Sequence, residues 1–351
     1  MPQLVYATEE ILSEHEYVRF SEAMGHRLHG GYDADGEYHS PRTLKRWPAI
    51  DAWRENFLAA GGDLIDASTR ILKSEHYPNH AQMKLLLDHG IGRPLWNSIS
   101  TTGIIEGRGK ALANIVAPDF QKIVEEDITE TTTGHLNKGL FVAHGLDEGG
   151  AVGSEIGAHD TMWFVARDLV LGENAYPIPE IPQRGGRPGA DERELPEVPG
   201  PYEALIKQLM GLLMIEIRAE KGFLFNAGIM RDPTLFTDRR EQAEIAAKLV
   251  DLIRVDEKPH VAYLQLFLSE LRGFTFKTSD GRRVKGAEFI DPLWERIVKW
   301  NTENVPPTQR KNQRAFIEQC IREREDGADG EDGDELLSRF DALWEGEPVA
   351  V

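Results

Sequence analysis

The stretch from Val255 to Leu271, VDEKPHVAYLQLFLSEL, constrains the fold most, because it places two ionisable side chains in line with an apolar helix face. Glu257 and His260 are three residues apart, so both project from one side of a helix. The same side continues into Tyr263, Leu264, Phe267 and Leu271. An acid and an imidazole that face a core need a partner, because unpaired buried charge is costly. A metal ion is one such partner, and an ion pair is another.

Composition and charge exclude several classes of partner. The chain has 351 residues, 40% of them hydrophobic, which is enough for one large domain or two ordinary ones. Its formal net charge of -19 disfavours nucleic acid and anionic membranes. Cys320 is the single cysteine, so neither an internal disulfide nor a cysteine-based zinc site is possible. The sequence lacks a signal peptide and an 18-residue apolar run, so we expect a cytoplasmic protein that does not span a membrane.

The first third of the chain predicts a helical layer over residues 1–118, packed on a core that follows it. Residues 25–43 are rich in Gly, Asp and His, which is typical of a loop. From Ala49 onward the apolar residues recur at helical spacing. We interpret the histidines of this region as surface or helix-end residues.

Two segments then bring acids and histidines close together in the sequence. Residues 119–148 predict one long helix that carries Glu126, Glu130, His144 and Glu148 on roughly one face and His135 on a neighbouring face. Residues 151–171 predict a second helix, on which Glu155 and His159 are four residues apart.

The remaining segments complete a helical pattern. Residues 173–200 are dominated by Pro and Gly and predict a long loop, either a solvated connection or a cover over a site. Residues 202–230 are apolar nearly all round, which indicates a buried helix, yet they contain Glu216 and Glu220. Short alternating runs within 274–290 predict a β-hairpin. Residues 301–351 predict an acidic tail that is disordered or loosely held near 322–335. A short amphipathic helix follows in this tail and would pack on its own chain or on a second subunit. The second alternative would make the protein a homodimer.

Four segments with inward acids or histidines, in this order, resemble the ferritin-like di-iron carboxylate proteins. In that superfamily a four-helix bundle holds two metals with one Glu from each of two helices and a Glu-x-x-His from each of the other two. Glu257-x-x-His260 matches the motif of the fourth helix, and Glu216 or Glu220 would be the ligand from the third helix. Glu126 or Glu130 would be the ligand from the first helix. On the second helix, Glu155-x-x-x-His159 takes the place of Glu-x-x-His and has one extra residue between the acid and the histidine. The resemblance covers roughly residues 119–271.

The resemblance implies a mainly α fold with a ferritin-like core over residues 119–300. It also implies two irons per chain, or manganese, and a di-iron oxidase or oxygenase that activates dioxygen to oxidise a small organic substrate. Glu257 would bridge or chelate the metals and His260 would bind one of them, while His135 and His144 would be extra nitrogen ligands or would orient a carboxylate. The candidate metal ligands are thus Glu126, Glu130, His135, His144, Glu155, His159, Glu216, Glu220, Glu257 and His260.

Two alternatives stay open at this stage. One is a metalloprotein that carries out no oxidation, such as a hydrolase or a metal-storage protein. The other is a metal-free helical interaction or scaffold protein, whose internal acids would pair with Arg167, Arg218, Arg239 or Arg272. The sequence contains no phosphate-binding P-loop, no G-x-S-x-G and no dinucleotide-binding G-x-G-x-x-G. It therefore indicates no catalytic residue outside the candidate ligands.

Overall fold

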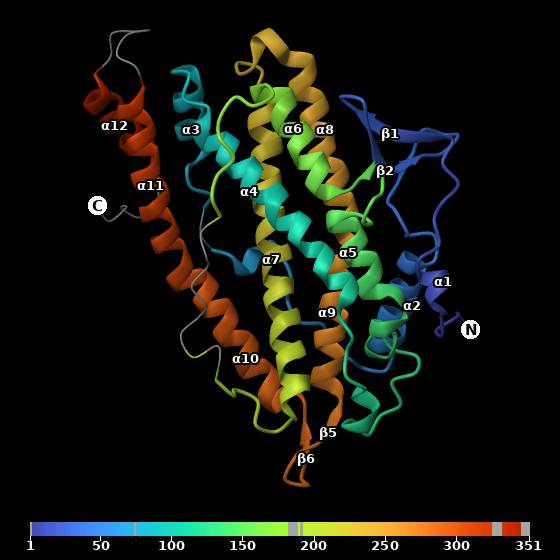
Figure 1. The fold of residues 1–351 in the computed structure, drawn as a ribbon. Coiled ribbons are helices and arrows are strands. Elements are labelled where there is room, and N and C mark those ends of the chain that lie inside the picture. The colour runs from blue at the N-terminus through green and yellow to red at the C-terminus, as the bar shows by residue number, and fades with distance from the viewer. Residues whose placement is uncertain (1, 74, 182–188, 190–191, 325–331, 345–351) are drawn as a thin grey trace.

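Helices dominate the computed structural model, which describes residues 2–73, 75–181, 189, 192–324 and 332–344 (Figure 1). This confirms the predicted mainly α class. The core consists of four helical rods that pack side by side, through contacts of α4 with α5 and α6, of α8 with α6 and α7, and of α7 with α9. In chain order the rods are α4 (Arg93–Gly109), α5 (Phe141–Gly149) with α6 (His159–Leu171), α7 (Gly200–Arg231), and α8 (Arg240–Asp256) with α9 (Lys258–Gly273).

The second and third rods run in the same direction. Gly172, just after α6, lies close to Arg239 at the start of α8, so α6 and α7 end at the same end of the molecule. Residues 172–199 therefore connect that end with the opposite end, where α7 begins beside Phe120. This is the segment that the sequence predicts as a long loop, and part of it lies outside the described residues.

The fourth rod is broken where its acid and histidine lie. Pro259 occupies the first turn of α9, where the missing N–H costs no hydrogen bond but the ring ends the preceding helix. Glu257 is the junction residue between α8 and α9, and His260 follows in the first turn of α9. The predicted helices over 202–230 and 255–271 are thus present, the second with this break.

The prediction of one long helix over 119–148 is wrong. Short 3₁₀ turns at Phe120–Lys122 and Thr133–His135 and a π-helical turn at Leu136–Leu140 precede α5. Gly139 has a φ of 103°, which interrupts the helical path. Glu270 of α9 accepts the backbone N–H groups of Thr132 and Thr133, so the rod, rather than a helix of their own, satisfies these donors. The helix predicted from residue 151 likewise begins only at His159.

The N-terminal region contains a small sheet where the sequence predicts a loop. The strands are β1 (Arg19–Ala23), β2 (His26–Tyr32), β3 (Tyr38–His39) and β4 (Ile156–Gly157). β2 pairs antiparallel with β1 and β3 and parallel with β4, so an excursion between α5 and α6 completes the sheet. Gly25, with a φ of 76°, makes the turn between β1 and β2. The sheet carries buried His29 to the rods.

The other elements surround the four rods. They are α1 (Thr8–Ile11), α2 (Arg46–Ala59), α3 (His80–Asp88), the hairpin β5 (Thr275–Lys277) and β6 (Arg283–Lys285), α10 (Ala287–Lys299), α11 (Val305–Glu323) and α12 (Gly333–Ala342). The hairpin and the amphipathic α12 confirm their predictions, and α12 packs on α11 and α3 of its own chain. The sequence did not predict α11, and the most acidic stretch, 325–331, lies outside the described residues. No helix in the ranges described here is long and apolar enough to cross a membrane.

Candidate metal centre

Seven buried ionisable side chains from all four rods meet near the middle of the molecule. They form two groups that share Glu148, and within each group the possible ligand atoms lie within 4.8 Å of one another. The first group is His144, Glu148, Glu216 and His260, and the second is Glu106, Glu148, His159 and Glu257. We call these seven residues the metal centre. Carboxylates and imidazoles that converge in this way could hold a metal ion.

In the first group two stacked imidazoles face two carboxylates. The rings of His144 and His260 lie 3.7 Å apart at their centroids. His144 Nε2 is 3.3 Å from Glu216 Oε1 and 3.4 Å from Glu148 Oε1. His260 Nδ1 is 3.3 Å from the same Glu148 oxygen. One oxygen of Glu148 therefore faces both imidazoles.

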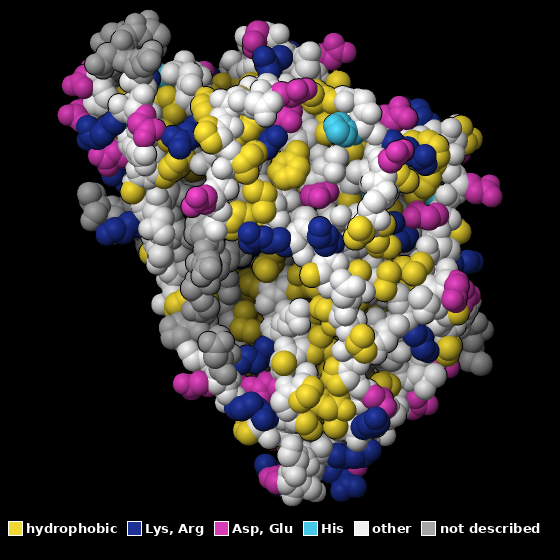
Figure 2. All heavy atoms as spheres, in the orientation of Figure 1, with side chains coloured by type: hydrophobic (Ala, Val, Ile, Leu, Met, Phe, Trp, Pro, Cys, Tyr) yellow, Lys and Arg dark blue, Asp and Glu magenta, His cyan; other side chains and the backbone are white. Residues whose placement is uncertain are grey.

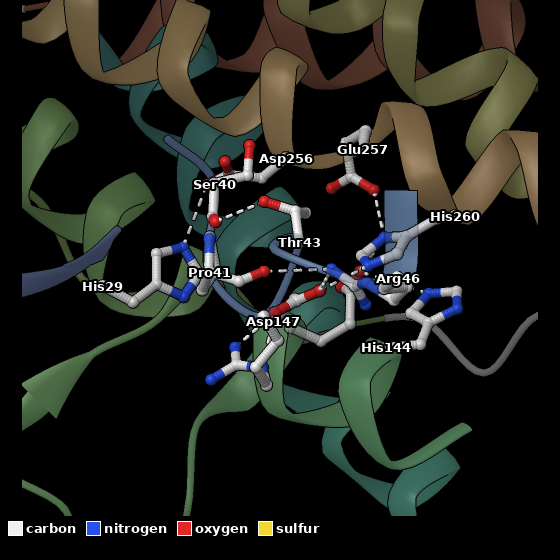
Figure 3. Close-up of polar contacts among 12 residues, drawn as sticks. His29, Ser40, Pro41, Thr43, Arg46, His144, Asp147, Asp256, Glu257 and His260 are labelled. Atoms are coloured by element: carbon white, nitrogen blue, oxygen red, sulfur yellow. Dashed lines mark hydrogen bonds and ion pairs between the residues drawn. The ribbon is translucent and has the colours of Figure 1, made fainter. Parts of the chain in front are cut away.

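In the second group one imidazole faces three carboxylates. His159 Nδ1 lies 3.1 Å from Glu257 Oε1, 3.5 Å from Glu106 Oε2 and 3.8 Å from Glu148 Oε1. The other oxygen of Glu257 is 2.6 Å from His260 Nδ1, so Glu257 also joins the two groups. Figure 3 shows Glu257 directed toward His260 from the α8–α9 junction.

Helical spacing and glycine place these side chains. His144 and Glu148 are four residues apart on α5, so they share a face. A Cβ at Gly109, the last residue of α4, would lie 2.6 Å from Glu148 Cγ, and a Cβ at Gly145 would lie 2.5 Å from the Ala113 nitrogen. These close approaches need residues without a side chain. They bring the end of α4, which carries Glu106, against α5.

Each of the three imidazoles directs its second nitrogen toward a polar group outside the metal centre. His260 Nε2 lies 3.0 Å from Asp147 Oδ2, and His144 Nδ1 lies 2.9 Å from the Tyr263 hydroxyl. His159 Nε2 lies 3.6 Å from Asp256 Oδ2. A histidine that binds metal usually has its other ring nitrogen held by a carboxylate or another polar group, which fixes the ring orientation and tautomer. His144 and His260 have this arrangement, whereas His159 Nε2 lies beside Asp256 without a hydrogen bond.

The two outer carboxylates are themselves held. Asp147 forms ion pairs with Arg42 and Arg46 (Figure 3). Burial opposes ionisation of Asp147, but the two arginine charges and the His260 hydrogen bond outweigh it and hold the Asp147 pKa well below its usual range. Asp256 accepts a hydrogen bond from the Tyr38 hydroxyl at 3.0 Å and lies 3.1 Å from His29 Nε2. The N-terminal sheet therefore supports the metal centre from outside.

Several inward atoms have no hydrogen-bond partner among the described residues. They are His144 Nε2, His159 Nδ1, Glu148 Oε1 and Glu257 Oε1, all buried. Buried polar atoms without a partner are rare, because each loses its hydration without compensation. Here all four face the same small volume. Their residue types and convergence fit a bound cation.

The four carboxylates of the metal centre differ in how readily they ionise. Burial, followed by repulsion from Glu257, raises the pKa of Glu216 to about 8. Burial and repulsion from Glu148 raise the pKa of Glu106 well above its usual value. Burial also opposes ionisation of Glu148 and Glu257, but the neighbouring imidazoles outweigh it and lower the pKa of both carboxyls. All four carboxylates share one buried volume. Two divalent cations would balance their four negative charges while the imidazoles remain neutral.

The structure brings together five of the ten residues suggested by the sequence: His144, His159, Glu216, Glu257 and His260. The other five, which lie outside these groups, are Glu126, Glu130, His135, Glu155 and Glu220. Glu130 and Glu155 are exposed in connecting segments. Glu126 accepts hydrogen bonds from the backbone and hydroxyl of Thr275.

The remaining two have other partners. Glu220 forms a salt bridge with Arg254 on the outer side of α7. His135 Nδ1 donates to the Thr131 carbonyl, and His135 Nε2 accepts the Tyr6 N–H, so both of its nitrogens are used.

Sequence reasoning missed two residues of the metal centre. Glu106 lies on α4, inside the stretch assigned to the N-terminal layer, and the residues around it read as a glycine-rich end of a short helix. Glu148 shares a face with His144, a signal that was visible in the sequence. The outer groups His29, Tyr38 and Asp147 depend on contacts between segments far apart in the chain and leave no local pattern.

Comparison of the chain with family models, with curated proteins and with solved structures gives no match. The functional inference therefore rests on the geometry of the metal centre.

Proposed function

We propose that the metal centre binds two metal ions and that the protein is a di-iron oxidase or oxygenase acting on a small organic molecule. The observation that carries the proposal is the convergence of four buried carboxylates and three buried imidazoles around Glu148, with inward atoms that have no hydrogen-bond partner in the described chain. These atoms lie 3.1 to 3.8 Å from oppositely charged groups of the same cluster without forming hydrogen bonds, and a metal ion among them would give each a ligand bond.

The order of the residues along the rods supports the ferritin-like resemblance in a revised form. One Glu comes from the first rod, one from the third, and Glu257-x-x-His260 from the fourth. The first rod is α4 with Glu106, in place of residues 119–148. The second rod offers His144-x-x-x-Glu148 in place of Glu-x-x-His, and His159 is an additional imidazole. The long connection between the second and third rods also suits a ferritin-like bundle.

The ligand chemistry favours iron or manganese. Mixed carboxylate and imidazole donors suit these metals better than all-oxygen calcium sites or thiolate zinc sites. Cys320 lies in a separate cluster with Ile317 and Phe340 and supplies no thiolate here. Iron bound at the centre would supply the electrons that reduce dioxygen. The residues of the chain would hold the metals, orient the imidazoles through Asp147 and Tyr263, and keep bulk water out.

A metal-free role has less support. The arginines that the sequence offered as partners lie elsewhere: Arg167 pairs with Asp168 and Arg272 with Asp291. Arg218 donates to Asn301 and Gln309, and Arg239 lies near Asp238. These partners lie outside the metal centre.

Metal analysis of the purified protein tests the proposal. We expect two iron or manganese ions per chain for the wild type, and a loss of at least one in Glu216→Gln. Glu220→Gln is the matched control, because Glu220 is one turn further along α7 and pairs with Arg254. Oxygen consumption with ascorbate as reductant then separates an oxidative enzyme from a storage or hydrolytic metalloprotein. A folded wild type without metal after growth in metal-replete medium would contradict the proposal.

A further inference from the structure

A third group of buried ligand atoms lies beside the metal centre. It consists of His29, His159 and Asp256, whose possible ligand atoms lie within 4.8 Å of one another. His159 belongs to both places, because its Nδ1 faces the second group of the metal centre and its Nε2 faces Asp256. Figure 3 shows His29 and Asp256 on the opposite side of the view from His144. Two imidazoles and one carboxylate thus meet in a second small volume.

Segments far apart in the chain supply these three side chains. His29 lies on β2, His159 is the first residue of α6 and Asp256 is the last residue of α8. Leu28 of β2 pairs with Gly157 of β4, two residues before His159, so the sheet brings the two histidines together. Their rings are 5.0 Å apart at the centroids and nearly perpendicular, at 83°. In this arrangement both rings direct Nε2 toward Asp256.

The N-terminal sheet covers this group. The exposed fraction is 6% for His29 and 0% for His159 and Asp256. The first two residues of β2 are exposed and the next five, which include His29, are buried. Figure 2 shows basic, acidic and hydrophobic side chains over β1 and β2, which lie at the upper right of Figure 1. The group therefore lies beneath the covered side of the sheet, where unpaired polar atoms are costly.

Four nitrogen and oxygen atoms of this group have no hydrogen-bond partner among the described residues. They are both ring nitrogens of His29, Nε2 of His159 and Oδ1 of Asp256. The two Nε2 atoms lie 3.1 Å and 3.6 Å from Asp256 Oδ2, but neither forms a hydrogen bond with it. That oxygen accepts its hydrogen bond from the Tyr38 hydroxyl. A hydrogen-bonded ion pair would align an N–H with the carboxylate, so an ion pair alone does not explain the group.

The spacing and the donor types suit zinc. Ligand atoms around a tetrahedral ion with bonds of about 2.1 Å are about 3.4 Å apart, close to the two distances between imidazole and carboxylate. Two imidazoles, a carboxylate and a water molecule are a donor set that zinc uses in proteins. Imidazoles outnumber carboxylates here, which favours zinc over manganese. Iron sites with these three ligands keep open positions for reactants, whereas this group lies beneath a sheet.

Charge balance supports one divalent ion. His159 presents a nitrogen to each of the two places, and an imidazole that binds a metal ion through both nitrogens has released its ring proton to the solvent. The resulting imidazolate and the Asp256 carboxylate carry two negative charges together. One divalent cation balances these two charges, so it adds no uncompensated charge to the buried cluster.

We propose that His29, His159 and Asp256 bind a zinc ion, separate from the two ions of the metal centre. The zinc ion ties the N-terminal sheet to the start of α6 and the end of α8. Glu257 follows Asp256 directly, so the zinc ion also fixes the junction that carries a residue of the metal centre. This site goes beyond the function proposed above, because it requires neither iron nor an organic substrate.

X-ray diffraction near the zinc edge tests the position of the ion. Crystals of the full-length protein, loaded with iron and then with zinc, give data just above and just below that edge, and the difference between the two locates zinc alone. We expect one zinc peak among His29, His159 and Asp256. No zinc peak there, zinc only among the seven residues of the metal centre, or an iron peak in its place would overturn the proposal. This measurement on the wild type needs no variant to fold.

Metal analysis of variants tests the ligands. We expect one zinc ion per chain in the wild type besides the two ions of the metal centre, and His29→Gln should lose the zinc and keep the other two. His26→Gln, at the exposed end of the same strand, is the matched control and should keep all three. Added zinc should raise the Tm of the wild type and the control but not that of His29→Gln. Unchanged zinc content in His29→Gln would overturn the proposal.

The zinc site and the metal centre fail separately. Zinc bound through His29 in a protein that holds no metal among Glu106, Glu148 and Glu216 contradicts the metal centre alone. Two ions at the metal centre, with no zinc lost in His29→Gln, contradict the zinc site alone.

Discussion

His260 and Asp147 meet across two rods, with His260 Nε2 and Asp147 Oδ2 3.0 Å apart. The same imidazole presents Nδ1 to Glu257 and Glu148 of the metal centre. Asp147 therefore fixes which nitrogen of His260 carries a proton and which faces inward. Arg46, which is buried, donates to the same Asp147 oxygen at 2.7 Å, and Arg42 pairs with the other oxygen.

Asp147→Asn tests this outer support. We expect metal affinity to fall about 10- to 100-fold, because an amide no longer selects the inward tautomer of His260. Unfolding free energy should fall by about 3 kcal/mol, because buried Arg46 loses its charged partner. Competition with a metal chelator and urea unfolding measure the two effects. The control is Asp251→Asn, which removes a partly exposed ion pair with Arg231 and should leave metal affinity unchanged. Unchanged affinity in Asp147→Asn would contradict this role.

Tyr263→Phe removes the hydroxyl that holds His144 Nδ1 at 2.9 Å. The ring would remain packed in the core, so we expect a loss of stability of only about 1 kcal/mol. Metal affinity at the group of His144 and Glu216 should fall about 10-fold, since the orientation of His144 is no longer fixed. Stepwise titration with manganese, followed by electron paramagnetic resonance, should show one weakened and one unchanged site. Equal weakening of both sites would argue against a local role for Tyr263.

Gly109→Ala should disturb the metal centre although the substitution favours helix. Alanine has a higher helix propensity than glycine by about 1 kcal/mol. A Cβ at Gly109 would, however, lie 2.6 Å from Glu148 Cγ and 2.8 Å from Glu148 Cβ. We expect lower thermal stability and reduced metal content. At Gly228 on α7 an added Cβ would meet nothing within 4 Å, so Gly228→Ala should leave metal content unchanged and raise stability. If both substitutions stabilise the protein equally, the close packing of α4 on α5 is refuted.

His135 should make the fold sensitive to acid. Burial, with repulsion from Lys138, outweighs the hydrogen bond to the Thr131 carbonyl and lowers the pKa of His135 to about 4, against an ordinary value of 6.5. The unfolded chain takes up this proton below pH 6.5 and the folded chain does so only below about pH 4. Stability from His135 is therefore present above pH 6.5 and is lost as pH falls toward 4. Between pH 7 and 5 the loss is about 2 kcal/mol.

Urea unfolding at the two pH values measures this loss, and comparison with His135→Gln isolates the contribution of the imidazole. The variant should lose about 2 kcal/mol less than the wild type over the same pH interval. An identical pH dependence for the two proteins would show that His135 takes up its proton equally readily when folded.

The sequence predicts the third and fourth rods well because their own side chains determine their burial. The stripe from Tyr263 to Leu271 has helical periodicity, and the length of the apolar run in α7 indicates a buried helix without reference to any partner. Glu216, Glu257 and His260 are conspicuous there as ionisable groups on buried helices. The hairpin around Asp280 is similarly local, since turn residues and alternation determine it.

The first two rods could not be predicted in the same way. Residues 119–135 carry apolar residues at nearly helical spacing, but their backbone donors are satisfied by Glu270, a contact made across more than a hundred residues. Glu106 enters the metal centre only because Gly109 and Gly145 let α4 approach α5. His29 reaches Asp256 only because β2 pairs with β4, a contact between segments far apart in the chain.

Anomalous X-ray diffraction at the iron edge, from crystals of iron-loaded protein, tests the central claim most directly. The account predicts two anomalous peaks on either side of the Glu148 carboxylate, one beside His144, Glu216 and His260 and the other beside Glu106, His159 and Glu257. A map without peaks among these seven side chains, or with iron only at surface acids such as Glu155, would contradict it.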